Sequence, residues 1–261
     1  MDTGLTDSVA LITGAGAGIG LAITRALLAE GARVAAVDLD PGAAVAGVES
    51  DRALGIAVDL RRPESSQDAV DRAVAHFGSL AILVNNVGVA PFREGFLTVS
   101  DAEWLDLMEL NFLSMVRGCR AAIPHMLDAG AGSIVSIASD TARVPAPFLV
   151  DYSVTKGAIL TLSRALANEF AGAGIRSNCV SPGPTRTTPF RQSPHFARLA
   201  AEQGVSREEA IQGYVRDRGM PLGRLGEAED VAAVVVFLAS SLARQITGAD
   251  YRVDGGLVPV A

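Results

Sequence analysis

Short runs of apolar, often β-branched residues alternate along the chain with longer amphipathic segments. Strands are predicted at residues 8–13, 33–38, 54–59, 80–85, 132–138, 175–181 and 249–253. Helices are predicted between them at residues 18–30, 63–77, 101–127, 150–171 and 227–238. Several of these strands are apolar throughout, which indicates burial on both faces. The alternation predicts an α/β fold with a doubly wound, mostly parallel seven-stranded sheet and helices on both of its faces.

One stretch departs from this rhythm. Residues 184–222 contain four prolines, scattered charges and two weak helical patterns, at 196–203 and 207–218. A long, partly helical connection in a compact fold often serves as a lid or a binding element. We therefore predict a substrate lid at 184–222 within a single domain spanning residues 1–261, because no linker, repeat or charge block divides the chain.

Composition and charge narrow the range of partners. The chain has 22 Lys and Arg residues against 29 Asp and Glu, which gives a formal net charge of −7. This balance argues against nucleic acid and anionic membranes as partners. The apolar stretch at 231–243 is shorter than the ~20 residues that span a bilayer, and the first residues resemble no targeting leader. The chain has only two cysteines, which favours a reducing compartment, so the sequence predicts a cytoplasmic protein. The charge balance predicts that its partner is a small molecule.

The first predicted strand leads into a glycine-rich turn, where a predicted helix begins. The turn contains Gly14, Gly16, Gly18, Ile19 and Gly20. Glycines let the backbone turn tightly and approach a pyrophosphate, whose charge is then met by free amides and the helix dipole. The spacing departs from the G-x-G-x-x-G pattern, and a plain tight connection is the alternative. The position between the first strand and the first helix favours a dinucleotide site.

Asp38 ends the second predicted strand, followed by Leu39. A carboxylate at this place can accept hydrogen bonds from both hydroxyls of the adenosine ribose. A 2′-phosphate there would meet a like charge, at a cost of about 4 kcal/mol for charges ~4 Å apart in an effective dielectric near 20. The sequence therefore predicts NAD rather than NADP, with capping of the loop at 40–42 as the alternative role of Asp38. Asp59, followed by Leu60, is predicted to contact the adenine, or alternatively to cap a helix.

Candidate proton chemistry lies further along the chain. Tyr152 and Lys156 are four residues apart near the start of a predicted helix, so they share one face. A nearby ammonium lowers the pKa of a phenol, and such a pair can donate and accept a proton. Ser139 ends a strand 13 residues before Tyr152, where its hydroxyl can bond a substrate oxygen. Asn111 lies inside a long predicted helix, where asparagine is disfavoured unless it serves another purpose.

These motifs together resemble the short-chain dehydrogenase/reductase family, in its shorter, single-domain branch. They occur in the order Thr13-Gly14-x3-Gly18-Ile19-Gly20, Asp59, Asn85-Asn86-x-Gly88, Asn111, Ser139, Tyr152-x3-Lys156 and Pro182-Gly183. The resemblance implies a Rossmann-type fold and adds further cofactor contacts at Asn86, Gly88, Pro182, Gly183, and Thr185 or Thr187. It also implies a homotetramer or homodimer.

The resemblance further implies a role for each residue of the reactive end. Tyr152 is the acid and base, and Lys156 lowers its pKa and holds the nicotinamide ribose. Ser139 orients the substrate oxygen, and Asn111 supports a proton-relay water. The sequence thus predicts an NAD-dependent oxidoreductase that interconverts a secondary alcohol and a ketone. Besides Ser139 and Tyr152, the residues predicted to contact the substrate are Val144, Phe148 and Phe190.

Other functions are weighed against this prediction. A 3-oxoacyl-carrier-protein reductase is one alternative, although those enzymes usually have a shorter connection after Pro182-Gly183 and no acid at the position of Asp38. A non-catalytic NAD-binding sensor is another. The S-x-x-K pattern at 153–156 lacks the companion elements of acyl-serine hydrolases. His195 is interpreted as a solvated lid residue, and no cluster of Cys and His indicates a metal.

Overall fold

The structure is a computed structural model, and it describes residues 1–259. Within them, a sheet of seven parallel strands runs through the molecule. The strands are β1 (Val9–Thr13), β2 (Arg33–Asp38), β3 (Ala53–Ala57), β4 (Ile82–Asn85), β5 (Gly132–Ile137), β6 (Ile175–Pro182) and β7 (Asp250–Val253). The α-helices are α1 (Gly18–Ala29), α2 (Gly42–Val45), α3 (Ser65–Phe77), α4 (Asp101–Met108), α5 (Ser114–Ala129), α6 (Val150–Phe170), α7 (Thr188–Arg191), α8 (Pro194–Gln203), α9 (Arg207–Asp217) and α10 (Ala228–Ala239).

The order of the strands in the sheet is β3-β2-β1-β4-β5-β6-β7. The strands β2 and β3 are therefore added on one side of β1. The chain then crosses to the other side of β1, where β4, β5, β6 and β7 follow in order. Because all strands are parallel, their carboxyl ends meet at one edge. Ligands of such sheets bind in the crevice at that edge, next to the point where the direction of building reverses.

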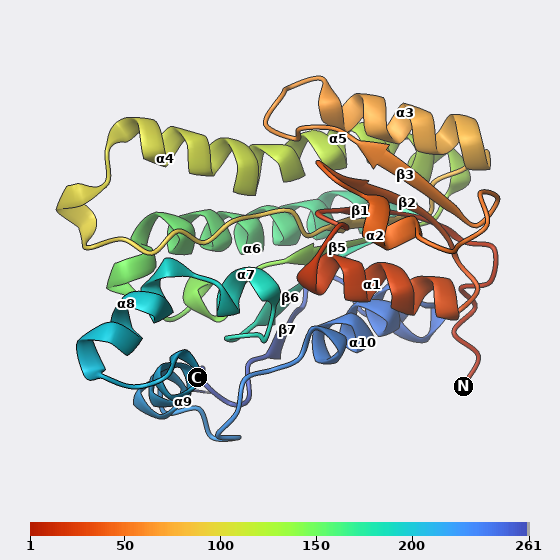
Figure 1. Ribbon diagram of the computed structural model, residues 1–261. Helices are drawn as coiled ribbons and strands as arrows, with labels where there is room; N and C mark the ends of the chain where they lie inside the picture. Colours follow the sequence, from red (N-terminus) through yellow and green to blue (C-terminus); the bar gives the residue numbers. More distant parts are fainter. Residues whose placement is uncertain (260–261) are drawn as a thin grey trace.

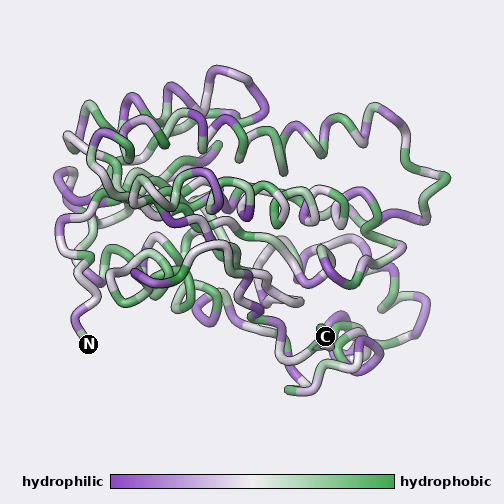
Figure 2. Tube along the Cα trace, turned by 180° about the vertical axis from the view of Figure 1, so that it is seen from behind, coloured by the Kyte–Doolittle hydropathy of each residue, from purple (hydrophilic) through white to green (hydrophobic). Residues whose placement is uncertain are grey.

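Both faces of the sheet are buried, which explains the uninterrupted apolar runs of the sequence. In β1, Val9 and Leu11 pack in one apolar cluster with α3, α5 and α6. Ala10 and Ile12 pack in a second cluster with α1 and α10. Figure 1 shows these two helical layers on opposite faces of the sheet. In Figure 2, hydrophobic and hydrophilic positions alternate along these helices, as expected when each turns one side toward the sheet.

The doubly wound parallel sheet predicted from the sequence is confirmed, with differences at several element boundaries. The strand predicted at 80–85 begins at Ile82, and the helix predicted from residue 63 begins at Ser65. The helix predicted at 101–127 is divided into α4 and α5 by a π-helical turn at Glu109–Leu113. The four-residue helices α2 and α7 were not predicted, because one turn is too short to show a periodic pattern.

Residues 184–222, called the lid segment below, contain α7, α8 and α9. They have an apolar cluster of their own, built around Phe196, Ile211, Val215 and Met220 with Leu225. Phe196 is fully buried. The two weak helical patterns are thus confirmed as helices that pack on one another, and Figure 1 shows this part of the chain beyond the main helical layers. Among the described residues no helix is both long and apolar enough to cross a membrane.

Candidate active site

The glycine-rich turn lies between β1 and α1, at the carboxyl edge of the sheet. Gly14 has a φ of +66°, in the left-handed region that favours glycine. A Cβ at Gly20 would lie 2.0 Å from the carbonyl oxygen of Gly14. The side-chain Nδ2 of Asn86, which follows β4, donates hydrogen bonds to the carbonyl oxygens of Thr13 (2.9 Å) and Gly14 (3.0 Å). The turn is therefore held by backbone contacts so close that side chains at positions 14 and 20 would displace it.

Asp38 lies beside this turn at the end of β2. Its Oδ2 accepts a hydrogen bond from the backbone N–H of Gly16 (2.9 Å), and its Oδ1 accepts one from the N–H of Asp40 (3.2 Å). A Cβ at Gly16 would lie 2.3 Å from the carbonyl oxygen of Asp40. The carboxylate is therefore fixed against the glycine turn. The capping of the loop after β2, which the sequence left open as an alternative, occurs together with this contact.

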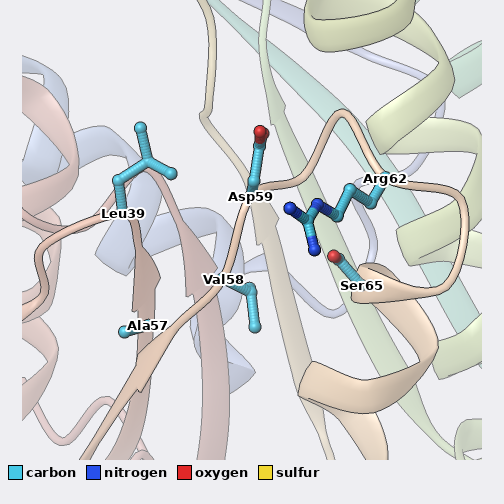
Figure 3. A pocket seen from close by; sticks show the side chains of 6 residues that line it. All are labelled: Leu39, Ala57, Val58, Asp59, Arg62 and Ser65. Atoms are coloured by element: carbon cyan, nitrogen blue, oxygen red, sulfur yellow. The ribbon is translucent and has the colours of Figure 1, made fainter.

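A groove of about 370 Å³ opens beyond Asp38. It is lined by Leu39, Ala57, Val58, Asp59, Arg62 and Ser65, and Figure 3 shows Asp59 between Leu39 on one side and Arg62 and Ser65 on the other. Leu39 is 67% exposed, so it offers an open apolar surface to a flat ring. Asp59 accepts a hydrogen bond from the N–H of Arg61 and does not cap α3, which begins at Ser65. Leu60 is buried in the core, so only its backbone can contact a ligand.

The residues predicted for the reactive end lie together at the same edge of the sheet. Lys156 is buried, and its Nζ donates a 2.7 Å hydrogen bond to the carbonyl oxygen of Ile137 in β5. The same Nζ lies 5.5 Å from the centre of the Tyr152 ring. The hydroxyl of Ser139 lies close enough to Tyr152 to lower its pKa. Tyr152 as a whole residue is half-buried.

Burial controls the acid–base properties of this pair. It raises the pKa of Tyr152 to about 12, against the opposing effect of the Ser139 hydroxyl. Burial also lowers the pKa of Lys156 to about 8. The lysine was expected to lower the pKa of the tyrosine, but in the protein alone only the Ser139 hydroxyl lowers it, and desolvation outweighs this effect. Tyr152 is therefore a neutral phenol near pH 7, which is the form that donates a proton.

Asn111 lies in the π-helical turn between α4 and α5, where it is buried. Its side chain donates to the carbonyl oxygen of Val89 (2.9 Å) and accepts from the N–H of the same residue (3.0 Å). It also donates to the hydroxyl of Thr155 on α6 (3.3 Å). Single π-turns inside helices frequently occur at functional sites. Asn111 thus ties the loop after β4 to the helix that carries Tyr152, which accounts for an asparagine inside a helix.

The remaining predicted cofactor residues lie near Lys156 and Asn111 or near the glycine turn. Gly88 faces Asn111 and Lys156, since a Cβ there would lie 3.2 Å from the Oδ1 of Asn111 and 3.6 Å from the Nζ of Lys156. Pro182 ends β6, and the N–H of Gly183 donates to the carbonyl oxygen of Val253 (3.0 Å). Thr187 lies next to Gly18 of the glycine turn. Thr185 is buried, and its hydroxyl donates to the carbonyl oxygen of Gly183 (2.9 Å).

The predicted substrate contacts lie in different surroundings. Val144 is 44% exposed. The ring of Phe148 stacks on that of Phe92, with 5.5 Å between the ring centres. The ring of His195, in the lid segment, also stacks on Phe92, with 4.2 Å between the ring centres. His195, which was interpreted as a solvated residue, is half-buried and packs against aromatic rings, and burial lowers its pKa. Phe190 packs on Phe196 inside the lid segment.

Comparison with known proteins identifies the family. Residues 14–258 match a family model described as Enoyl-(Acyl carrier protein) reductase. The chain is 37% identical to 2-(S)-hydroxypropyl-CoM dehydrogenase 3 of Xanthobacter autotrophicus, and the match covers all of both proteins. The chain belongs to the short-chain dehydrogenase/reductase family. As a short-chain dehydrogenase/reductase it is an oxidoreductase that acts on CH–OH groups with a nicotinamide cofactor.

Further similar proteins show the range of this family. D-threitol dehydrogenase of Mycolicibacterium smegmatis is 36% identical, covering 98% of this chain and 94% of the relative. L-sorbose reductase of Gluconobacter frateurii, solved with NADPH and L-sorbose, has a TM-score of 0.93 and 32% identity over the full length of both chains. A 3-ketoacyl-(acyl-carrier-protein) reductase of Brucella melitensis, solved with NADH, has a TM-score of 0.85 and 33% identity, covering 97% of this chain and 99% of the other.

The residues of this short-chain dehydrogenase/reductase fit a dinucleotide. At Gly14, Gly16 and Gly20 a Cβ would collide with neighbouring atoms of the protein itself, so the glycines permit the tight backbone path that a pyrophosphate-binding turn needs. The groove beside Leu39 is open for the adenine, and Asp38 lies between the groove and the turn. Lys156 and Tyr152 lie at the other end of the edge, where the nicotinamide would bind. No group of His, Cys, Asp and Glu in the described residues is arranged to hold a metal ion.

Two ion pairs beside Tyr152 were not predicted. Arg93, in the loop after β4, bonds the fully buried Asp151 through its Nε (2.9 Å) and Nη2 (2.7 Å). Arg218, at the end of α9, bonds Asp140 at 2.5 Å. Asp140 and Asp151 each adjoin a predicted catalytic residue in the sequence. Their positions in the sequence could therefore have marked the two aspartates as candidates for a role at the site. Nothing in the sequence indicates that Arg93 and Arg218 are their partners.

The stability of this short-chain dehydrogenase/reductase is expected to depend on pH through Lys156. Between about pH 8 and the ordinary lysine pKa of 10.5, the unfolded chain binds a proton that the folded chain lacks. The free energy of unfolding therefore rises with pH in this window. Lys156 can raise the free energy of unfolding by about 3 kcal/mol over this window, because each unit of pKa shift corresponds to about 1.4 kcal/mol.

Urea unfolding of wild type and Lys156→Met at pH 8 and pH 10.5 measures this effect. The wild type is expected to gain stability relative to the variant over this range. An equal change in both proteins would contradict burial of the ammonium as the cause.

Proposed function

We propose that this protein is an NAD(H)-dependent oxidoreductase that interconverts a secondary alcohol and a ketone, with Tyr152 as the acid and base. The observation that carries the proposal is the placement of Ser139, Tyr152 and Lys156 around one point at the carboxyl edge of the sheet. A simple nucleotide-binding sensor has no use for a proton donor at that point. This argues against the non-catalytic alternative.

The chemistry follows from these three side chains. Bound nicotinamide would supply or accept the hydride. In ketone reduction, the neutral phenol of Tyr152 donates its proton to the substrate oxygen as negative charge develops there. Ser139 bonds the same oxygen and so orients the carbonyl. Lys156, protonated below about pH 8, stabilises the phenolate that remains. Oxidation of the alcohol runs through the same contacts in reverse.

The preference for NAD rests on Asp38. Its carboxylate is fixed by the amides of Gly16 and Asp40, so it cannot easily turn away from a 2′-phosphate. Asp38→Asn keeps an oxygen acceptor and removes the charge. The ratio of kcat/KM for NADP to that for NAD is expected to rise at least tenfold in this variant, since removing one repulsive charge pair is worth about 1.4 kcal/mol or more.

Asp40→Asn is the matched control, because Asp40 is an exposed carboxylate in the same loop that only caps the N–H of Gly42. Its cofactor ratio is expected to stay near that of wild type. A wild-type enzyme that works as well with NADP as with NAD would contradict the preference itself.

The substrate is expected to be a medium-sized, largely apolar alcohol, because Phe92, Phe148 and His195 form an aromatic stack next to the site. The second candidate function is reduction of a 3-oxoacyl thioester, which the similarity to the Brucella melitensis 3-ketoacyl-(acyl-carrier-protein) reductase supports. A panel of secondary alcohols with NAD, and of ketones and acetoacetyl thioesters with NADH, read by NADH absorbance, separates the two. Turnover of the thioester alone would favour the second function.

A further inference from the structure

The ion pair between Asp140 and Arg218 connects the lid segment to Ser139. Asp140 immediately follows Ser139, and its side chain is 6% exposed. One of its oxygens, Oδ1, accepts a hydrogen bond from the Ser139 hydroxyl (2.8 Å). The other, Oδ2, accepts one from the Nη2 of Arg218 (2.5 Å), which closes α9. A continuous chain of hydrogen bonds therefore runs from the lid segment to the candidate catalytic serine.

Asp140 determines where the Ser139 hydroxyl points. Besides donating to Asp140, the Oγ of Ser139 accepts hydrogen bonds from the N–H of Thr141 (3.2 Å) and from its hydroxyl (3.0 Å). A hydroxyl has only one proton to donate. Without substrate, Asp140 accepts that proton and the Ser139 oxygen is held from three sides. A substrate carbonyl takes the proton in exchange for Asp140, while the two hydrogen bonds from Thr141 keep the serine oxygen in place.

Arg218 holds Asp140 in the orientation that this chain requires. Its side chain is 17% exposed and lies over the ring of Tyr214, 6.0 Å from the ring centre. Burial raises the pKa of Asp140, and the guanidinium of Arg218 acts against that rise, whereas Asp254 adds to it. Removing Arg218 would leave a buried carboxylate without its counter-ion, and such a group takes up a proton or moves toward water.

We propose that Asp140 and Arg218 are positioning residues that couple the seating of α9 to the orientation of Ser139. Arg218 holds Asp140, and Asp140 holds the hydroxyl of Ser139 until a substrate oxygen takes its proton. The serine is correctly placed for this exchange only when the lid segment is in place. Neither residue needs to touch the substrate. This inference rests on the proposed function, because it takes Ser139 as a catalytic residue.

The test uses Asp140→Asn, Arg218→Gln and Arg218→Lys in the full chain. Asp140→Asn and Arg218→Gln are each expected to lower kcat about 10- to 100-fold, since a slightly misplaced catalytic group costs that much. KM is expected to change little. Arg218→Lys, which keeps the charge, is expected to recover part of the loss, whereas a purely steric role would show no such rescue. Arg216→Gln is the matched control, because Arg216 is an exposed arginine on the same helix.

A double variant, Asp140→Asn with Arg218→Gln, decides whether the two residues act as one unit. If they do, the double variant loses no more activity than the worse single variant. Losses that multiply, or a change in KM with kcat intact, would overturn the proposal. NADH binding, followed by its fluorescence, is expected to remain in every variant and shows that each is folded.

Trypsin sensitivity tests the link without any turnover. Asp140→Asn leaves the sequence of the lid segment unchanged, so cleavage at Arg216 reports how often α9 leaves its place. Cleavage is expected to be faster in this variant than in wild type, and equal rates would overturn the coupling. A wild-type protein without activity on any alcohol or ketone would contradict the proposed function, while the cleavage rates would still decide the link between Arg218 and Asp140.

Discussion

Tyr152→Phe is expected to lower kcat about 1,000-fold, within the range that a positioned proton donor contributes. Phenylalanine keeps the ring and its packing beside Lys156 and removes only the hydroxyl that donates the proton. The Nζ of Lys156 stays at its place because it is held by the carbonyl oxygen of Ile137. NADH affinity is therefore expected to change little. Steady-state kinetics with the best substrate of the panel, together with NADH fluorescence titration, measures both quantities.

Tyr251→Phe is a suitable control for this experiment. Tyr251 lies on β7, where its ring packs against Phe237 at 6.3 Å, on the side of the sheet covered by α10. Removing the hydroxyl of Tyr251 in this variant is expected to leave kcat unchanged. If Tyr152→Phe retained near wild-type turnover with NADH still bound, Tyr152 would not be the acid and base.

Arg93→Ala is expected to lower the free energy of unfolding by about 3–5 kcal/mol, because it leaves a buried charge without its partner. Asp151 is fully buried, and Arg93 bonds it through two nitrogens while a third bonds Glu103 at 2.6 Å. The other oxygen of Asp151 accepts the N–H of Tyr152 (2.9 Å). The variant therefore also weakens the start of the helix that carries the acid and base.

Urea unfolding of Arg93→Ala beside Arg72→Ala tests this expectation. Arg72 pairs with Asp68 four residues earlier on the exposed side of α3, at 3.4 Å. Exposed pairs of this kind contribute less than about 1 kcal/mol. Similar losses in the two variants would mean that Asp151 is not dependent on Arg93 for its charge balance.

The sequence predicted the parts of the structure that local patterns encode. Short apolar runs such as 34–37 favour strands buried on both faces, and the glycines at 14 and 20 occupy backbone positions that tolerate no side chain. The order of these elements then determined which edge would carry Asp38, Ser139 and Tyr152. For this reason the candidate site could be assembled from residues far apart in the chain before any contact was known.

The sequence did not predict contacts that depend on packing between distant segments. The partners Arg93 and Asp151 are 58 residues apart, and Arg218 and Asp140 are 78 apart. Nothing in the local pattern around either arginine distinguishes it from a solvated one. The stacking of His195 on Phe92 was missed for the same reason, and the π-turn at Asn111 because an inserted residue leaves the helical period almost unchanged.

The strand order also has a consequence for how the chain folds. Ala10 of β1 pairs with Ile82 of β4, and every other strand pairing closes a loop across a helix, so the paired strand residues are all far apart in the chain. Folding is expected to be slow compared with that of helical proteins of this size, because these loops must close before their contacts form. However, the four strands β3, β2, β1 and β4 are neighbours and are all made by residue 85. During synthesis, these four strands are therefore complete before the ribosome has reached Tyr152, whereas the face of β1 that α10 covers stays open until residue 239 is made.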